Sequence, residues 1–580
     1  MRLDMHHAAA SSGPLVPRAA ERITAERITA ERITVERITV ERIAVGHWRG
    51  WIPRVVLAAL LAGFLSGCTP CREYIQNGFK VGPNYCKPAA PVADQWIDAS
   101  DARVGKGSEN LSHWWTLFKD PALNGLICNA SQQNLTLREA GFRILQARAQ
   151  LAIDTGNLFP QEQAATGSYT RTAISRETAT GQNISQRFFS QYNYGFNLTW
   201  ELDFWGRFRR AIEADSATLD ASIEGYDDVL VTLLADVATN YTALRTTEQR
   251  IKTAQDNVTL QRETLAIVQA RFNAGTTSEL DVSQAKSTLA STQAQIPQFE
   301  IALRQATNQI CILLGMPPEE LRRRLGPGPI PTAPKEVAVG IPADLLRRCP
   351  NVRRAERQAA AQSAVIGIAE SEFYPHIAIN GTIGGAAEQF KNLGRPDAMT
   401  GSIGPSFQWN ILNYGRLLNN VRLQEARFQE LIAAYQETVL EANRDAENGL
   451  VGFLKSEERT AFQATSVNEA EEAVKIALAQ YRAGTIDFTR VTQVEQTLVL
   501  QQDTLAQAQG EIINGLITLY RAVGGGWEIR IEGCQPMTLT GEPLPAPAPA
   551  VEPLPSAKPE DPILSAMRPL PEIPAANQLR

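Results

Sequence analysis

The side chains that could perform chemistry are few and stand far apart. Of the five histidines, His6, His7 and His47 lie in an N-terminal region that we expect to be removed, which leaves His113 and His376. Neither has the acidic or cysteine neighbours that would complete a metal site or a catalytic triad. The sequence also lacks a glycine-rich phosphate loop followed by lysine and a G-x-S-x-G elbow. It therefore predicts neither an enzyme nor a bound metal or cofactor.

One cysteine stands in a pattern with a definite chemistry. Two arginines flank an apolar run at residues 55–64, which is too short for a permanent membrane helix of about 20 residues. The run ends in Leu-Ser-Gly-Cys at 65–68, which resembles the lipobox where bacterial lipoproteins are cleaved and lipidated. We expect residues 46–67 to be a signal peptide and Cys68 to carry the lipid. Thr69 stands where an aspartate is associated with inner-membrane retention, so the resemblance implies the outer membrane.

Six further cysteines suggest no catalytic role. Cys71 and Cys86 lie close enough in sequence to pair in an oxidising periplasm, although spacing alone does not establish a bridge. The other four are scattered, and we expect them to be small buried apolar residues: Cys128, Cys311, Cys349 and Cys534.

The two ends of the chain differ in composition from the middle. Residues 21–45 repeat the unit ERITA or a close variant five times. A period of five fits neither a helix nor a strand, so we expect residues 1–45 to be a non-structural extension or a mis-called start. Prolines alternate with alanines from Pro545, which predicts a disordered Pro-rich tail at 528–580. The net charge of −6 argues against binding to nucleic acid.

The middle of the chain contains an internal duplication. A shift of 209 residues places Trp200 on Trp409 and Gly206 on Gly415, and it aligns the turn at 272–276 with that at 481–485. So long a period indicates a duplicated domain rather than a solenoid. Each repeat is expected to begin with a helix, at 121–157 and at 344–373, which a proline ends.

Strands are expected next in each repeat. Apolar residues alternate with polar ones at residues 192–202 and 402–411. About 11 residues with a period of two match a membrane-barrel strand, although a half-buried strand of a soluble sheet alternates in the same way. Weaker partners at 164–173 and 377–386 would give four strands per chain. The polar positions would line a wet lumen: Asn193, Asn197, Glu201, Gln408 and Asn410.

The period then changes to that of helices packed in a coiled coil. Residues spaced by seven run from Leu244 to Phe272 and, in the second repeat, from Phe453 to Tyr481. A helix over 207–273 would be roughly 100 Å long. It would turn at Gly275 and return to about residue 315, with the counterpart returning to about 524. Four strands cannot close a barrel in lipid, and such helices expose too much apolar surface alone, so we expect a ring of protomers.

At this point the sequence resembles the outer-membrane factors of tripartite efflux pumps (TolC-like and OprM-like channels), especially their lipoprotein branch, the NodT family. The resemblance covers about residues 68–527. It is carried by Val81-Gly82-Pro83-Asn84-Tyr85, by Trp114-Trp115-Thr116-Leu117-Phe118-Lys119-Asp120-Pro121, by Ile341-Pro342-Ala343-Asp344-Leu345-Leu346, and by the two Ala-Gly-Thr turns.

The resemblance implies a mainly α-helical fold with a membrane β-barrel. Three protomers would supply a 12-stranded barrel and an α-helical periplasmic tunnel. The implied partners are two further copies, outer-membrane lipid, a periplasmic adaptor and an inner-membrane transporter of the RND type. Adaptor docking would use the turns at Gly275, Thr276, Gly484 and Thr485. The domains would be a mature N-terminal segment at 68–120 and two repeats at 121–330 and 331–527.

The tunnel tip departs from the family pattern. Aspartates often narrow the tip after the second turn, whereas this chain has Asp487 followed by Arg490 and Gln493. Asp281 is the equivalent of Arg490 in the first repeat. We therefore hypothesise a gate held by Asp281–Arg490 pairs; the alternative is that both are solvated surface charges.

Three functions remain open at this level. The favoured one is a passive duct for small molecules such as drugs and toxic compounds. The same fold serves as the outer-membrane channel of type I protein secretion. A periplasmic coiled-coil scaffold lipoprotein would leave the alternating strands and the duplication unexplained.

Overall fold

The computed structural model describes residues 71–105, 111–178, 185–534 and 538–539. All of them belong to one compact unit, Thr69–Arg580. The ERITA-type repeats, the signal peptide, Cys68 and residues 540–580 of the expected tail lie outside the described residues.

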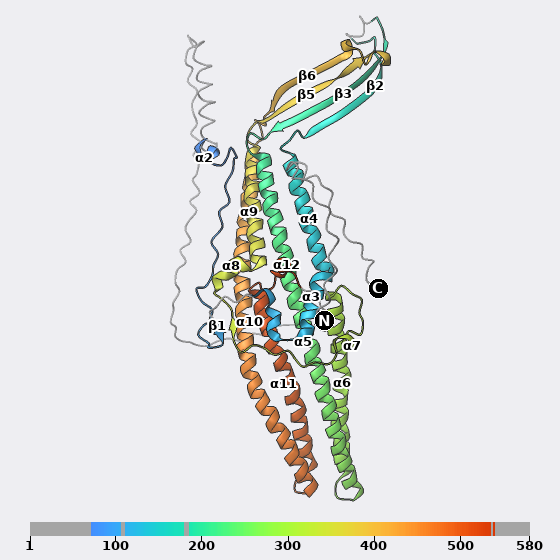
Figure 1. The fold of residues 1–580 in the computed structure, drawn as a ribbon, viewed down its shortest axis with the longest axis vertical. Coiled ribbons are helices and arrows are strands. Elements are labelled where there is room, and N and C mark those ends of the chain that lie inside the picture. Colours follow the sequence, from blue (N-terminus) through green and yellow to red (C-terminus); the bar gives the residue numbers. More distant parts are fainter. Residues whose placement is uncertain (1–70, 106–110, 179–184, 535–537, 540–580) are drawn as a thin grey trace, which may run out of the picture. The chain divides into compact units, whose positions relative to one another are not determined.

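The first repeat passes from helices to strands and back to helices (Figure 1). Its elements are α3 (Pro121–Gln133), α4 (Leu135–Gly156), β2 (Glu162–Ala173), β3 (Phe188–Leu202), α5 (Arg207–Asn273) and α6 (Glu279–Leu313). The second repeat has the same order in α8 (Leu345–Arg348), α9 (Pro350–Ser371), β5 (His376–Ala387), β6 (Met399–Gln408), α10 (Arg416–Ala483) and α11 (Phe488–Ala522). The predicted duplication is therefore confirmed element by element.

Short elements precede, join and follow the repeats, and two lie inside the second one. The short elements are α2 (Cys71–Gln76), β1 (Val104–Gly105), η1 (Leu111–Phe118), α7 (Arg322–Leu325), β4 (Val337–Ala338), η3 (Pro342–Asp344), η4 (Phe390–Asn392), η5 (Pro396–Ala398) and α12 (Ile529–Glu532). Of these, η4 and η5 lie between β5 and β6. β1 pairs with β4 in parallel. Because α12 is helical, the expected tail begins with an ordered segment.

The first helix of each repeat is broken, which the sequence analysis did not predict. Asn134 separates α3 from α4 because its side chain caps α4 at Leu137 and donates to the Leu313 carbonyl at 2.9 Å. Cys349 separates α8 from α9 because a residue before proline, here Pro350, is held in extended backbone.

The four longer strands form one antiparallel sheet in the order β2-β3-β5-β6. All four expected strands are present. β3 begins earlier than predicted, and β6 ends at Gln408, so Trp409 and Asn410 lie beyond the strand. In Figure 1 the sheet lies at one end of the long helices and the two helical turns lie at the other.

The long helices follow the predicted repeat of seven. Leu244, Ile251 and Val258 are buried, as are Val467 and Val474 in α10. Leu265 and Thr460 are half-buried, and Phe272 at the end of α5 is 38% exposed. Among the described residues, no helix is both long and apolar enough to cross a membrane.

Candidate functional site

The sheet has one polar face and one apolar face. On the polar face, Asn193 donates to Ser168 at 3.3 Å and Asn380 donates to Ser406 at 2.7 Å. The opposite face places Phe196 beside Ile383, and Phe196 and Ile403 are 62% and 80% exposed. This division follows from the alternation in the sequence, because successive side chains of a strand point to opposite faces.

The two helical turns have matching geometry at the far end of the long helices. In the first, the Thr276 amide and hydroxyl both donate to the Arg271 carbonyl, at 2.9 and 3.0 Å. In the second, Thr485 makes the same two bonds to the Gln480 carbonyl, both at 3.0 Å. Gly275 and Gly484 occupy the left-handed region that lets the chain reverse. The structure therefore places all four predicted docking residues in two equivalent turns.

A contact between the two hairpins holds these turns together. Arg271 at the end of α5 lies over the Tyr481 ring, 4.5 Å from its centroid, and donates to the Tyr481 carbonyl. Tyr481 packs against Phe488 at the start of α11. The sequence analysis placed Tyr481 in the helical seam but did not single out Arg271. The counterpart of Arg271 in the second repeat is Gln480, which carries no charge. This difference between the repeats is the sequence feature from which the contact of Arg271 could have been suspected.

The four candidate gate residues lie at the N-terminal ends of α6 and α11. Asp281 accepts a hydrogen bond from Thr277, and Arg490 donates to Gln493 at 3.2 Å. Asp487 is the N-cap residue of α11, as Ser278 is of α6. Within the described protomer, Asp281 and Arg490 do not form an ion pair with each other.

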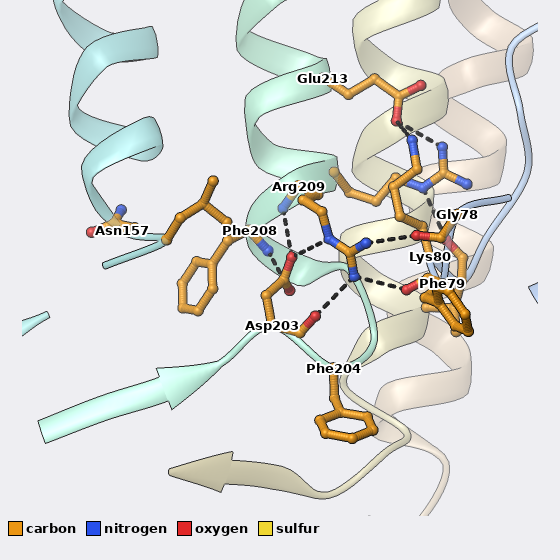
Figure 2. Close-up of polar contacts among 12 residues, drawn as sticks. Gly78, Phe79, Lys80, Asn157, Asp203, Phe204, Phe208, Arg209 and Glu213 are labelled. Atoms are coloured by element: carbon orange, nitrogen blue, oxygen red, sulfur yellow. Dashed lines mark hydrogen bonds and ion pairs between the residues drawn. The ribbon is translucent and has the colours of Figure 1, made fainter. Parts of the chain in front are cut away.

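At the other end of the long helices, the N-terminal segment is bound to the first turn of α5 (Figure 2). The Asp203 carboxylate accepts from the amides of Phe208 and Arg209 at 3.0 Å each. It also accepts from the Arg209 guanidinium at 2.8 Å, which fixes that side chain. Arg209 in turn donates to the carbonyls of Gly78 at 2.6 Å and Phe79 at 2.8 Å.

The next residue extends the same arrangement. Arg210 is fully buried and donates to the carbonyls of Val81 at 2.9 Å and Gly82 at 2.7 Å. Its charge is balanced by Glu213 at 2.8 Å. Two consecutive arginines therefore bind four backbone carbonyls in residues 78–82. We call residues 78–82 the strap.

The strap explains part of the Val81–Tyr85 motif. A Cβ atom on Gly82 would lie 2.3 Å from the Cα of Gly367 in α9, so only glycine fits. Sequence analysis missed Arg209 and Arg210. Their positions in the second repeat hold Leu418 and Asn419. This difference agrees with the contact, because only the first repeat binds the strap through a pair of arginines.

The cysteines are arranged differently from the prediction. Cys86 is an exposed free thiol, so the possible bridge between Cys71 and Cys86 is absent from the structure. A disulfide instead joins Cys128 in α3 to Cys534 after α12, with Cα atoms 5.6 Å apart. The expectation that both were unpaired buried residues was wrong, because folding brings together cysteines separated by 406 positions. Cys311 and Cys349 are buried and free, as predicted.

Both remaining histidines have acidic neighbours in space, contrary to the sequence reading. His376 lies 2.8 Å from Glu201 and 3.5 Å from Glu372, and His113 lies 3.5 Å from Glu532. Each set is an ion-pairing arrangement at the surface of a helix or strand end. Among the described residues, no group of three or more His, Cys, Asp or Glu side chains could hold a metal ion.

Comparison with known proteins matches this arrangement to a family. Residues 126–316 and 341–525 match the sequence model described as outer membrane efflux protein. The chain belongs to this family. Outer membrane efflux proteins are channels rather than enzymes, and the two matched segments fall on the two repeats.

Individual relatives agree over most of their length. Nodulation protein T of Rhizobium leguminosarum bv. viciae is 29% identical, covering 81% of this chain and 93% of the relative. The solvent efflux pump outer membrane protein SrpC of Pseudomonas putida is 30% identical, covering 78% and 96%. The structure of the outer-membrane channel OprN superimposes with a TM-score of 0.73 at 31% identity, covering 77% and 99%. This efflux protein is therefore an exit duct of the outer membrane that extends into the periplasm.

Proposed function

We propose that three copies of this chain form a lipid-anchored duct through which a tripartite pump expels small molecules. The observation that carries the proposal is the four-stranded sheet, which has one apolar face, one polar face and two unpaired edges. In lipid, unpaired backbone groups at an edge cost several kcal/mol each. Pairing β6 of one copy with β2 of the next removes every edge and gives a 12-stranded barrel with its polar face inward.

The partners are proposed from the opposite end of the helices. The two equivalent turns would present the same surface six times around a trimer, a repeated docking site for a periplasmic adaptor. An inner-membrane transporter of the RND type would supply the energy, since the duct has no chemistry of its own. SrpC is named as part of a solvent efflux pump, and this favours small molecules over secreted proteins as the cargo.

The lipid anchor is proposed at Cys68. The strap begins only ten positions after Cys68, and Arg209 and Arg210 bind it beside the end of β3 (Figure 2). A relative from Salmonella typhimurium, 26% identical, is named probable outer membrane lipoprotein SilC. An acylated Cys68 would thus tether the protomer at the membrane end of the helices.

The gate is proposed at the tunnel tip. Arg490 is exposed and Asp281 is partly exposed in the protomer, where each bonds only with residues of its own hairpin. In a closed trimer, Asp281 of one copy would pair with Arg490 of its neighbour, giving three pairs around the opening.

Reversing one charge of the proposed gate should open it. We expect Asp281→Arg or Arg490→Asp to raise the open fraction roughly tenfold, because exposed pairs contribute modestly and three would be lost together. The double variant restores the pair with opposite polarity and should return conductance toward the parent value. Single-channel recording in planar bilayers measures the open fraction and the conductance of each variant. Unchanged conductance and gating voltage in both single variants would show that these are solvated surface charges.

Export of a dye tests the function itself. We expect a deletion strain loaded with a fluorescent dye to retain it, and the complemented strain to lose it at the parent rate. A Cys68→Ala strain should export poorly, because sorting and tethering both depend on acylation. Labelling with radioactive palmitate, present in the parent and absent from Cys68→Ala, checks the modification. If the deletion strain exports dye normally but loses a secreted protein, the duct serves protein secretion instead.

A further inference from the structure

The apolar core of the long helices is interrupted. One buried cluster extends down the helices to Ile251 and Ala254 of α5 and Phe299 of α6. A separate cluster at the tip begins at Val268 of α5 and Ala285 of α6. The helices α5 and α6 are continuous through both clusters. The two clusters are therefore separated by a change in the side chains that are buried, and not by a break in the helices.

The buried residues in this gap are mostly polar. In α5 they are Asn257, Val258, Gln261 and Thr264, and in α6 they are Thr288 and Thr292. The facing stretch of α11, residues 495–502, buries the carboxylate of Glu495 and one apolar side chain, Leu498, which belongs to the tip cluster. We call the polar residues of α5 and α6 at these positions the polar band.

Hydrogen bonds join α5 to α11 across or beside the band. Thr264 donates to the buried Glu495 at 2.6 Å, and Asn257 donates to Gln502 at 2.8 Å. Arg250 and Asp503 form an ion pair at 2.6 Å. Burial raises the pKa of the Glu495 carboxyl, while the bond from Thr264 opposes the rise. Such bonds can be exchanged for bonds to water, whereas buried apolar contacts cannot.

A pocket also lies beside the band. It has a volume of about 350 Å³, is partly open to the surface, and is lined by Gln261, Thr288 and Thr292 together with Arg250 and Asp503. Gln261 is only 3% exposed, yet neither its amide oxygen nor its amide nitrogen has a hydrogen-bond partner. Unsatisfied polar atoms beside a polar cavity are weakly held and gain from the entry of water.

A proline lies at the upper border of the band in α6. Pro297 is inside the helix and has no N–H, so the carbonyl of Gln293 loses its helical partner. Prolines are the usual sites at which helices bend. Its side chain is exposed, so no packing role accounts for it.

We propose that the polar band is a hinge about which the tip cluster tilts as a rigid unit, with α6 bending at Pro297. The tip cluster resists deformation because opening it would expose apolar surface at about 25 cal/mol per Å². The band resists less, because its polar groups exchange partners with water. The hinge rests on the proposed function in one respect: tilting the tip is what would open and close the duct.

Filling the band with apolar side chains tests the hinge. A triple variant, Gln261→Leu, Thr288→Val and Thr292→Val, would join the two clusters, whereas Pro297→Ala restores the α6 backbone bond at an exposed site. A nitroxide on Ala483→Cys, in a Cys71→Ser and Cys86→Ser background, reports distances between tips in the purified trimer by pulsed electron resonance. We expect both variants to narrow the distance distribution and to lower the open fraction in bilayers about tenfold.

The matched control is Thr307→Val. Thr307 is buried in the same helix but among the upper cluster, so this change should leave the distribution as it is in the parent. The hinge would be overturned if the triple variant and Pro297→Ala both kept the parent's distribution of tip-to-tip distances. It would also be overturned if Thr307→Val narrowed that distribution as much as they do. The distance measurement requires neither substrate nor adaptor. If the parent failed to export dye, the proposed function would be wrong, but the result on the hinge would still hold.

Discussion

Replacing Gly82 with alanine is expected to remove most of the stable trimer from the outer membrane. The new Cβ would lie 2.3 Å from the Cα of Gly367, which is backbone of α9 and cannot rotate away. Gly82 also has φ +85, where L side chains are strained by about 1–3 kcal/mol. Moving the strap would pull the Gly82 carbonyl away from Arg210, which is fully buried and would lose a partner for its charge.

The combined cost should exceed about 3 kcal/mol, which places Gly82→Ala among the severe single substitutions. Heat-stable trimers on gels and the amount of protein in outer-membrane fractions measure the effect. Gly78→Ala is the matched control in the same strap, because Gly78 has φ +66 but no atom within 4 Å of the new Cβ. It should cost only the backbone strain. Equal stability of the two variants would show that the contact with Gly367 is unimportant.

The contacts of the strap could not be predicted from the sequence, whereas the main elements of the fold could. Alternation and the repeat of seven predicted the strands and long helices because they record which face of an element is buried. The duplication predicted both turns, since Gly275 and Gly484 stand at equivalent positions. Contacts made by one repeat alone have no such signature. Arg209 and Arg210 bind carbonyls more than 120 positions away, and only the assembled fold brings these groups together.

The breaks in the first helices were missed for a related reason. Asn134 reads as an ordinary helix residue until Leu313, 179 positions later, supplies the carbonyl that its side chain binds. The break at Cys349 was within reach of the sequence, because Pro350 restricts the residue before it. Asp281 and Arg490 lie near the starts of α6 and α11, just after the two turns. Their proposed pairing between protomers stays a prediction, because it depends on an assembly that one chain does not contain.

The disulfide is the other feature with a large expected effect. Replacing Cys128 and Cys534 together with serine should lower the free energy of unfolding by about 2–5 kcal/mol, because the bridge closes a very long loop in the unfolded chain. The bridge also secures a C-terminal arm, residues 527–534. Arg530 in this arm forms a two-bond ion pair with the buried Asp227 at 2.6 and 3.1 Å. Burial raises the pKa of Asp227, and the pair with Arg530 opposes the rise.

Without the bridge, the arm would be held by noncovalent contacts: that ion pair, the contact of Arg353 with the Trp527 ring at 4.6 Å, the pair of Glu532 with His113 and the buried side chain of Ile529. We therefore expect cleavage after Arg530 by trypsin to become fast in the double serine variant, with a lower midpoint of thermal unfolding. Dithiothreitol should cause the same loss in the parent and none in the variant, and Cys86→Ser should behave as the parent. A parent midpoint that is insensitive to dithiothreitol would mean that the noncovalent contacts hold the arm without the bridge. In that case Asp227→Asn, which removes the partner of Arg530, becomes the variant that releases it.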